Sequence, residues 1–404
     1  MSTFNSAEKK FYKKIFKDFK LEFKADVQIN RVSWSKAYSE LVRSFKNNEA
    51  PDVFQLGTTW INTFAHLGYL APKPEFVSRK AITDWLHQRC CYRENTVAVP
   101  WNIAVKALLV HKKNFEKMDI SLSDLKNRDY FYSICHRIKE NRIVNSNFPF
   151  GVTFPLKTNK TTLHIFTAWL FATGGTFPDL KKKPIPEKIL RSPDCINNFR
   201  SIIKLLKTTA QKKEYTKFKK HMYEVYKEFE QGKQLFYLGD WQLRSQNEDW
   251  EERPYSILPI PAPEGENIHN KGGGSVLCVS STSSSPNLSW ELVKKITSDK
   301  YLDLWMEITG RLPAFQTNMW NKRFDEKMVQ KAYENILKSN GYPCHPLWGK
   351  IEDVLNEGIT NYIWKILNSS SPGAKINEQH PILKKADRQA ARILQYSWDF
   401  PHTK

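Results

Sequence analysis

Two short motifs are the parts of the sequence best suited to covalent chemistry. The adjacent carboxylates Glu251 and Glu252 could serve general acid–base catalysis, but they stand in a polar stretch without a recognisable pocket. The run Gly272-Gly273-Gly274 could approach a phosphate, yet no Lys-Ser/Thr pair of a phosphate-binding loop follows it. The patterns GxSxG, HExxH and GxGxxG do not occur. We therefore expect no enzyme, no catalytic residues and no cofactor.

The cysteines have the spacing of neither a metal site nor a dense disulfide framework. They are Cys90, Cys91, Cys135, Cys195, Cys278 and Cys344. Zinc sites and redox motifs use Cys-x-x-Cys pairs, which do not occur here. We expect most of these thiols to be reduced and buried as small apolar side chains, with Cys90 and Cys91 the pair best placed to react. No metal site is predicted.

Polar and aromatic residues follow one predicted strand at the position where ligands bind in α/β proteins. Asp52–Leu56 is predicted to be a strand that is left through a Gly-Thr-Thr turn into a helix. Strand, turn and helix in this order are typical of a parallel βαβ unit, whose ligands sit beyond the carboxyl ends of the strands. Gln55, Thr59 and Trp60 fall there.

Helical and strand periodicities alternate along the rest of the chain. Phe11, Ile15 and Phe19 recur every fourth residue among lysines, which predicts an amphipathic helix within residues 1–23. Further helices are predicted at 35–45, 60–70, 121–140, 161–173, most of 187–231, and 386–396. Further strands are predicted at 26–32, 96–102, 106–111, 236–241 and 276–280, with a proline-rich crossing segment at 255–263 and a glycine loop at 271–275.

The charge is strongly basic but evenly spread. The 404 residues carry a formal net charge of +20, which raises the question of a nucleic-acid partner. Lysines occur along nearly every predicted helix, and runs such as 181–183 are short, so we expect a solvated basic surface and no nucleic acid. No window offers the roughly 18 uncharged apolar residues of a membrane-spanning helix, and residues 1–23 lack the pattern of a secretory signal. As written, the chain is expected to be unexported and not an integral membrane protein.

Eight motifs in a fixed order resemble one known family. They are PDVFQLGTTWINTFAHLGYL (51–70), VAVPWN (97–102), FTAWLFATGG (166–175), LGDW (238–241), YSILPIPAP (255–263), GGGSVLCVS (272–280), ITGRLPAF (308–315) and HPLWGKIEDVL (345–355). Over residues 26–367 the sequence is similar to the extracellular solute-binding proteins, family 1, the sugar-binding components of bacterial ABC importers. Each motif alone is weak, but together and in order they are specific.

The resemblance implies an α/β protein of the type II periplasmic-binding-protein-like fold, with two lobes, a hinge and a ligand cleft between them. The implied first lobe is 1–106 plus 256–311, the second is 107–255 plus 312–370, and 371–404 is a C-terminal extension. The function implied is reversible binding of a mono- or oligosaccharide for an ABC sugar transporter, with the permease as partner. Sugars need flat apolar platforms for their C–H faces and directed polar groups for their hydroxyls.

The resemblance also carries site residues over to this sequence. The implied ligand-binding residues are Gln55, Thr59, Trp60, Trp101, His164, Trp169, Asp240, Trp241, Gly273, Gly274, Ser275, Arg311, His345 and Trp348. Each has a structural alternative, because tryptophans at helical spacing more often belong to a core, and Trp305 and Trp364 are assigned to the core. Asp240 could equally form a turn, and Arg311 could satisfy carbonyls at a helix end.

The sequence departs from the family at both ends. Relatives begin with a signal sequence and a first β-strand, and both are missing here, which is expected either from a truncated or fused chain or from an intracellular descendant. The family resemblance implies a periplasmic or cell-surface location, whereas the absent signal implies the cytoplasm if residue 1 is the true start. A ligand-sensing domain that signals on lobe closure is the alternative to a transport receptor.

Overall fold

The chain folds into two compact units, which are described separately. The computed structural model describes residues 6–77, 83–115, 118, 120–145, 148–156, 161–180, 183–240, 255–264, 272–317, 341–342, 345–369 and 376–398. Unit 1 comprises residues 1–104, 242–251 and 272–330, and unit 2 comprises 105–241, 252–271 and 331–404. The lobe boundaries inferred from the sequence remain a prediction.

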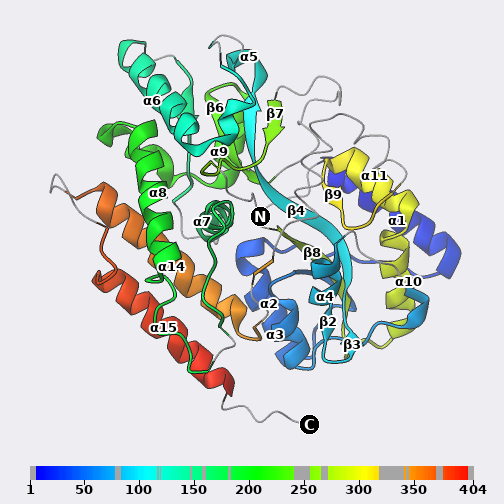
Figure 1. The fold of residues 1–404 in the computed structure, drawn as a ribbon. Helices are drawn as coiled ribbons and strands as arrows, with labels where there is room; N and C mark the ends of the chain where they lie inside the picture. Colours follow the sequence, from blue (N-terminus) through cyan, green and yellow to red (C-terminus); the bar gives the residue numbers. More distant parts are fainter. Residues whose placement is uncertain are drawn as a thin grey trace. The chain divides into compact units, whose positions relative to one another are not determined.

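Unit 1 is an α/β unit built on strands β1, β8 and the first half of β4 (Figure 1). Its strands are β1 (Val53–Gly57), β2 (Cys91–Tyr92), β3 (Asn95–Thr96), β4 (Val99–His111), β8 (Gly272–Val279) and β9 (Leu312–Pro313). Its helices are α1 (Ser6–Phe23), α2 (Trp34–Lys46), α3 (Ile61–His66), η1 (Glu75–Val77), α4 (Asp84–Arg89), α10 (Pro286–Ile296) and α11 (Asp299–Thr309). β8 lies between β1 and β4, and β1 pairs with β8 in antiparallel register, Val53 opposite Val279.

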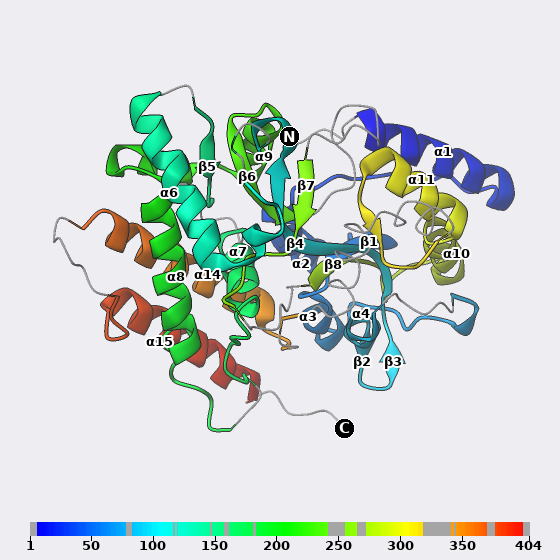
Figure 2. The same ribbon diagram turned by 45° about the horizontal axis from the view of Figure 1, so that its top comes forward.

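Helix α1 confirms the amphipathic helix predicted for the N-terminal region. Phe11, Ile15 and Phe19 are all buried, in a cluster shared with α10 and α11. The three helices lie side by side (Figure 2). At the periphery the Tyr301 hydroxyl donates to Asp18 at 2.7 Å. Apolar residues at every fourth position therefore fix which face of α1 is buried, and the lysines between them stay in water.

Unit 2 is helix-rich around a smaller group of strands. Its strands are the second half of β4, β5 (Phe150–Val152), β6 (Gln234–Asp240) and β7 (Tyr255–Leu258). Its helices are α5 (Lys112–Phe115), η3 (Asp124–Lys126), α6 (Arg128–Val144), α7 (Thr161–Phe171), α8 (Pro193–Thr209), η4 (Lys212–Lys219), α9 (Met222–Glu230), α14 (Trp348–Leu367) and α15 (Pro381–Trp398). Helix α7 is buried on nearly every side, which explains why its sequence is apolar almost throughout.

The C-terminal helix α15 is an integral part of unit 2. It packs along α14 (Figure 2), and a Cβ at Gly358 would lie 2.6 Å from the Cβ of Ala386. The buried carboxylate of Asp387 accepts from the Leu190 N–H and from Arg191 Nε, both at 2.7 Å. The region that the sequence assigned to an extension beyond the family pattern thus contributes to the core of this unit.

Several local predictions differ from the structure. Among the described strands, β5 and β6 pair in parallel, whereas β1 with β8, β2 with β3, and β4 with β6, β7 and β9 pair antiparallel. The sheet is therefore mixed. The predicted strands 96–102 and 106–111 are parts of one strand, β4, and the helix predicted from residue 121 begins at Arg128. Residues 26–32 form no strand. The prediction of a glycine loop at 271–275 is wrong from Gly272 onward, because strand β8 begins at that residue.

Most of the described cysteines are buried, as expected for small apolar side chains. Cys90, Cys135, Cys195 and Cys278 are buried and free, and Cys91 is partly buried. Burial raises the pKa of the Cys135 and Cys195 thiols to about 12 and raises that of Cys90 well above its usual value. These thiols stay protonated near neutral pH, so they are poor nucleophiles. Cys344 lies outside the described residues.

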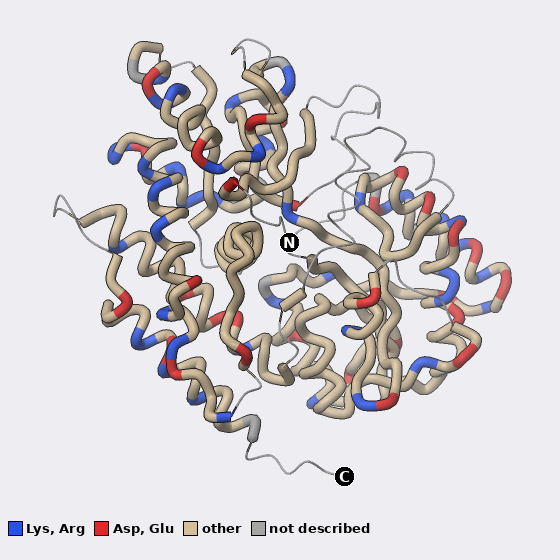
Figure 3. The backbone as a smooth tube through the Cα atoms, viewed as in Figure 1, with Lys and Arg blue, Asp and Glu red and all other residues tan. Residues whose placement is uncertain are grey.

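Basic and acidic residues alternate along the chain in both units (Figure 3). Many lysines pair locally, as Lys204 does with Asp129 at 3.1 Å and Lys14 with Asp18 at 3.2 Å. Exposed pairs of this kind contribute little to stability and are screened by salt. No helix of the described residues is long and apolar enough to cross a membrane.

A partly buried ion pair in unit 2 predicts how stability depends on pH. Burial alone would raise the pKa of Glu214, but the Gln211 N–H and the Arg142 and Lys217 cations outweigh it and lower that pKa below 4.5. A lowered native pKa means that the stabilisation is present above about pH 4.5 and is lost as the pH falls through the native pKa. In the Glu214→Gln variant, the free energy of unfolding should therefore fall less steeply as the pH is lowered from 7 to 3, as measured by urea unfolding. The control Glu187→Gln, at an exposed position, should leave this pH dependence as in the wild type. The same pH dependence of the unfolding free energy in the wild type and in Glu214→Gln would contradict this account.

Candidate functional site

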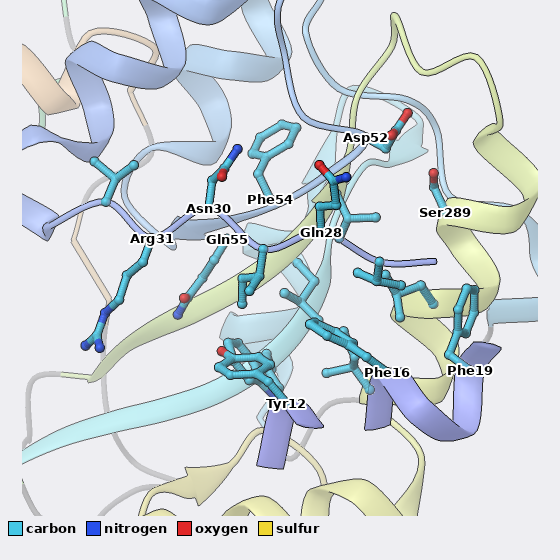
Figure 4. A pocket seen from close by; sticks show the side chains of 18 of the residues that line it. Tyr12, Phe16, Phe19, Gln28, Asn30, Arg31, Asp52, Phe54, Gln55 and Ser289 are labelled. Carbon is cyan, nitrogen blue, oxygen red and sulfur yellow. The ribbon is translucent and has the colours of Figure 1, made fainter. Parts of the chain in front are cut away.

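A cavity of about 770 Å³ lies within unit 1. It is bordered by α1, α2, the segment Ala25–Ser33 that joins them, β1, β8 and α10 (Figure 4). We call it the unit 1 pocket. Its size is in the range that holds small ligands. Of the residues predicted from the sequence, it brings together Gln55, Trp101 and Arg311.

One end of the pocket carries a cluster of charged groups. The buried Glu8 carboxylate lies between two cations, with Arg31 Nη2 3.3 Å from Oε2 and Arg311 Nη2 3.3 Å from Oε1. Both arginine side chains are partly exposed. A cluster held from both sides is already ordered before a ligand arrives, which reduces the entropy lost on binding.

Aromatic rings line the same end. Trp101 packs on Trp305 with ring centroids 4.7 Å apart, and Tyr12 lies 6.2 Å from Trp305. The Arg311 guanidinium lies over the Trp305 ring at 5.5 Å. Burial, and then the charge of Glu8, raises the pKa of Tyr12 to about 12, so its phenol is neutral at physiological pH. This end of the pocket therefore combines ring surfaces with hydrogen-bonding groups.

The indole N–H of Trp101 is a buried hydrogen-bond donor in the pocket lining. Trp101 is only 2% exposed, and its Nε1 has no hydrogen-bond partner among the residues that the structure describes. By contrast, the neighbouring Trp305 Nε1 donates to Asn102 Oδ1 at 2.6 Å, and Asn102 Nδ2 donates to Ser275 Oγ at 3.0 Å. A buried donor without an acceptor costs roughly 1–3 kcal/mol. An acceptor that reached Trp101 from the pocket would remove that cost.

Gln55 reaches the pocket because of the alternation along β1. Phe54 and Leu56 are buried in the cluster with α2 and α3, whereas Gln55 is partly exposed. The Gln55 side chain points away from Phe54 and toward the side of α1 (Figure 4). Its amide can both donate and accept, as recognition of hydroxyl groups requires.

Trp60 and Ser275, two further predicted residues of unit 1, have structural partners. Trp60 is 4% exposed and packs on Trp34 and Tyr38, each with centroids 5.5 Å away. Thr59 lies in the turn before α3. Ser275 is buried and accepts from Asn102, so it holds two strands together.

Gly273 and Gly274 correct the prediction of a loop whose backbone amides approach a ligand, because both lie in strand β8. A Cβ at Gly274 would be 2.1 Å from the carbonyl oxygen of Asn102. The missing side chain at Gly274 therefore lets β8 approach β4. This close approach explains a glycine at that position without a ligand.

The predicted residues of unit 2 are largely buried. Trp169 and Trp348 have no exposed surface, and their indole N–H groups donate to Ser201 Oγ at 2.7 Å and Glu352 Oε1 at 2.8 Å. His345 is 5% exposed, and its Nδ1 accepts from the Leu347 N–H just before α14. A role for them in ligand binding stays a prediction.

Two further unit 2 residues are more accessible. Partly buried His164 bonds through Nδ1 to the Tyr342 hydroxyl at 2.8 Å. The Asp240 carboxylate, 43% exposed, pairs with the buried Lys106 ammonium on the adjacent strand β4. Trp241 lies outside the described residues.

Sequence reasoning missed Glu8, Tyr12, Asn30 and Arg31, all of which line the pocket. A signal for two of them exists in the helical period. Glu8, Tyr12 and Phe16 are also spaced by four, one position along from the apolar stripe of Phe11 and Ile15. They form a second, mixed stripe at the edge of the buried face of α1. Asn30 and Arg31 gave no comparable signal, because only the tertiary structure brings them to the pocket.

The described lining of the pocket contains no histidine and no cysteine. Its titratable residues are Glu8, Tyr12, Asp26, Arg31, Asp52 and Arg311, and no serine or cysteine in its lining is paired with a histidine base. Within the described ranges, no group of three or more His, Cys, Asp or Glu is placed to hold a metal ion.

Comparison with known proteins decides the family. The sequence pattern of the family described as bacterial extracellular solute-binding protein matches residues 4–302, most of the chain. The chain belongs to this family. Members of this family are extracellular binding proteins rather than enzymes. The diacetylchitobiose binding protein DasA of Streptomyces coelicolor is 24% identical over 376 residues, covering 88% of this chain and 81% of DasA.

Solved structures show that the fold is also that of the family. A Thermotoga lettingae ABC transporter solute-binding protein bound with α-D-tagatose matches with a TM-score of 0.77 and 19% identity, covering 96% of this chain and 97% of that one. Maltose-bound MalE3 of T. maritima matches with a TM-score of 0.73 and 16% identity, covering 96% of each chain. The two-lobed α/β fold expected from the sequence is confirmed.

Proposed function

We propose that this chain binds a carbohydrate reversibly, with the unit 1 pocket as part of its site, and serves as the substrate-binding component of an ABC sugar transporter. Its partner is then the transporter permease, and it acts at the cell surface or in the periplasm. Relatives support the ligand class, since one is named for diacetylchitobiose and others are bound to tagatose or maltose.

The observation that carries the proposal is the charged and aromatic end of the pocket. A sugar ring presents C–H groups on its faces, which suit the partly exposed ring of Tyr12, and hydroxyls on its rim. Those hydroxyls can accept from Trp101 Nε1 and the arginines, and can exchange hydrogen bonds with Gln55 and Glu8. The chemistry required of this site is binding alone.

The proposal is tested by calorimetric titration with monosaccharides and oligosaccharides, tagatose, maltose and diacetylchitobiose among them. Gln55→Ala should weaken binding by about 5- to 100-fold, because a lost hydrogen bond to a buried polar group costs roughly 1–3 kcal/mol. Trp101→Phe should act in the same direction, since it keeps the apolar ring and removes the indole donor.

The matched control is Gln88→Ala, on the exposed face of α4 and outside the pocket, which should bind as the wild type does. Absence of saturable binding to every sugar by the folded chain would refute the proposed ligand class. Equal affinities for the wild type and Gln55→Ala would refute the pocket as part of the site.

A further inference from the structure

Residues 200–220, at the end of α8 and through η4, depart from the alternation of charges seen elsewhere. Eight of these 21 residues are Lys or Arg and one, Glu214, is acidic, so the segment has a net charge of +7 out of +20 for the whole chain. Helix α1 is also rich in lysine, but its six lysines stand among three carboxylates, which leaves it at +3. Blue predominates over red along α8 and η4 (Figure 3). A short segment of unit 2 therefore carries about a third of the excess charge.

The C-terminal end of α6 adds further cations to this segment. Helix α6 packs along α8, and Lys139 Nζ donates to the Lys207 carbonyl at 3.5 Å. Arg142 Nη2 lies 2.9 Å from Glu214 Oε1 in η4. The ends of α6 and α8 thus meet at η4 and form one cluster, which we call the basic patch and which consists of Lys139, Arg142, Lys207, Lys212, Lys213 and Lys217.

The carboxylate of Glu214 does not balance the cations around it. It is shared by Arg142 and Lys217, at 2.9 and 3.3 Å, and both cations also lie over the Phe150 ring, 5.2 and 4.6 Å from its centroid. Burial, and then the charge of Arg142, lowers the pKa of Lys217, although Glu214 opposes this shift. Positive potential therefore remains at the inner side of the patch.

The outer side of the patch consists of lysines that face water. Lys207, Lys212 and Lys213 are exposed, and within the described ranges none of them has an ionic partner. The nearby Lys204, by contrast, pairs with Asp129 at 3.1 Å. Like charges held close together repel one another, so an anionic surface that covered these lysines would relieve that repulsion.

An accessible apolar side chain borders the patch. Val144 ends α6, two residues after Arg142, and is 90% exposed, the highest value among the large apolar side chains of the described residues. Lysines alone would suit any polyanion. An apolar side chain beside them favours lipid, because it can enter the acyl boundary while the cations stay among the headgroups.

We propose that the basic patch of unit 2 docks reversibly on the anionic headgroups of a phospholipid bilayer, with Val144 in contact with the lipid. Each lysine near such a surface strengthens binding by about fivefold, so a few exposed cations suffice for reversible adsorption. The proposal does not rest on the proposed function, because the sugar pocket belongs to unit 1 and the patch to unit 2. Sugar binding and membrane binding are separate measurements.

The test is sedimentation of the full chain with vesicles of phosphatidylcholine, either pure or containing about 30% phosphatidylglycerol. Saturable binding is expected to the anionic vesicles and not to the neutral ones. It should weaken as the salt concentration rises from about 0.05 to 0.5 M, because salt screens exposed charges. Absence of binding to the anionic vesicles by the folded chain would overturn the proposal.

A matched pair of triple variants locates the docking surface. The combined change Lys207→Gln, Lys212→Gln and Lys213→Gln should weaken binding to the anionic vesicles by about 100-fold, since three fivefold contributions are lost. Its control removes the same charge from exposed positions of α1, and the loss there should stay below about threefold. The control changes are Lys9→Gln, Lys13→Gln and Lys17→Gln. Equal losses in the two variants would mean that net charge alone drives adsorption, and would overturn the patch.

Val144→Thr distinguishes a lipid surface from a soluble polyanion. The substitution keeps the shape and charge of the side chain but makes it polar, so binding to the anionic vesicles should weaken by about threefold to tenfold. Binding of soluble polyphosphate, which offers no apolar region, should be the same as in the wild type. Unchanged vesicle binding by Val144→Thr would show that the patch adsorbs polyanions in general, and would overturn the bilayer as its partner.

Discussion

Gly274→Ala is expected to lower the free energy of unfolding by about 2–5 kcal/mol, from overpacking and backbone strain together. The added Cβ would lie 2.1 Å from the carbonyl oxygen of Asn102 and 3.2 Å from the Cα of Ile103. Both neighbours are backbone atoms of β4, so neither can move away by a change of rotamer. The φ angle of +153° adds strain for any residue with a side chain.

Urea unfolding of the wild type and the variant measures this change. Gly57→Ala is the matched control in the strand on the other side of β8, because its new Cβ would meet nothing closer than 3.9 Å. We expect its free energy of unfolding to stay within about 0.5 kcal/mol of the wild type. A Gly274→Ala variant as stable as Gly57→Ala would show that β8 and β4 are not in the close contact described here.

The glycine run also shows where sequence reasoning reached its limit. A glycine signals that backbone must approach something closely, but the sequence does not say whether that is a ligand or another strand. The family resemblance favoured a ligand. The structure shows strand β4 at Gly274, because residues more than 170 positions apart, Asn102 and Ser275, are brought together by the sheet. Local sequence contains no information about that pairing.

Elements with strong local periodicity were predicted well. Helix α1, strand β1 and helix α7 follow from spacing and from flanking turns, since each has a buried face or is buried throughout. Residues 26–32 have strand periodicity and yet form no strand. A strand needs a neighbour for its ladder, and the described structure places none beside this segment. Periodicity predicts which side chains can be buried, not whether a partner is present.

The candidate site was predicted only in part, for a related reason. Gln55 and Trp101 line the unit 1 pocket from within strands β1 and β4, and Arg311 lines it from the turn between α11 and β9. Trp169 and Trp348 have the same residue type as Trp101 but are enclosed in the core of unit 2. Aromatic type alone cannot separate a ligand platform from a core residue. Among the described residues the Trp101 N–H has no partner, which separates it from the other two, and only the tertiary structure shows this.

Arg128→Ala is expected to destabilise unit 2 by about 3–5 kcal/mol. Arg128 is 5% exposed at the first turn of α6, where a cation is disfavoured by the helix dipole. Tertiary contacts hold it there. Its Nε donates to the Pro261 carbonyl at 2.9 Å, and its Nη groups donate to Ser201 Oγ and the Trp169 carbonyl, both at 3.3 Å.

The guanidinium also lies 4.4 Å from the centre of the Trp169 ring, so the variant loses a desolvated cation–π contact of about 2 kcal/mol. It leaves buried carbonyls without donors at roughly 1–3 kcal/mol each, offset in part by the desolvation cost of the cation. Arg128→Lys should recover little of the loss, because one ammonium cannot reproduce the planar fork that reaches three acceptors.

Lys204→Ala on the neighbouring helix α8 is the control for Arg128→Ala. Lys204 also lies over an aromatic ring, 4.5 Å from the centroid of Tyr132, and pairs with Asp129 at 3.1 Å, but its side chain is 57% exposed. Water and salt screen such contacts, so the expected change is below about 1 kcal/mol. Denaturant unfolding of both variants distinguishes the two cases. Similar losses of unfolding free energy in Arg128→Ala and Lys204→Ala would mean that burial does not strengthen the Arg128 contacts. The 255–263 segment, which contains the Pro261 carbonyl, would then be held by its own packing.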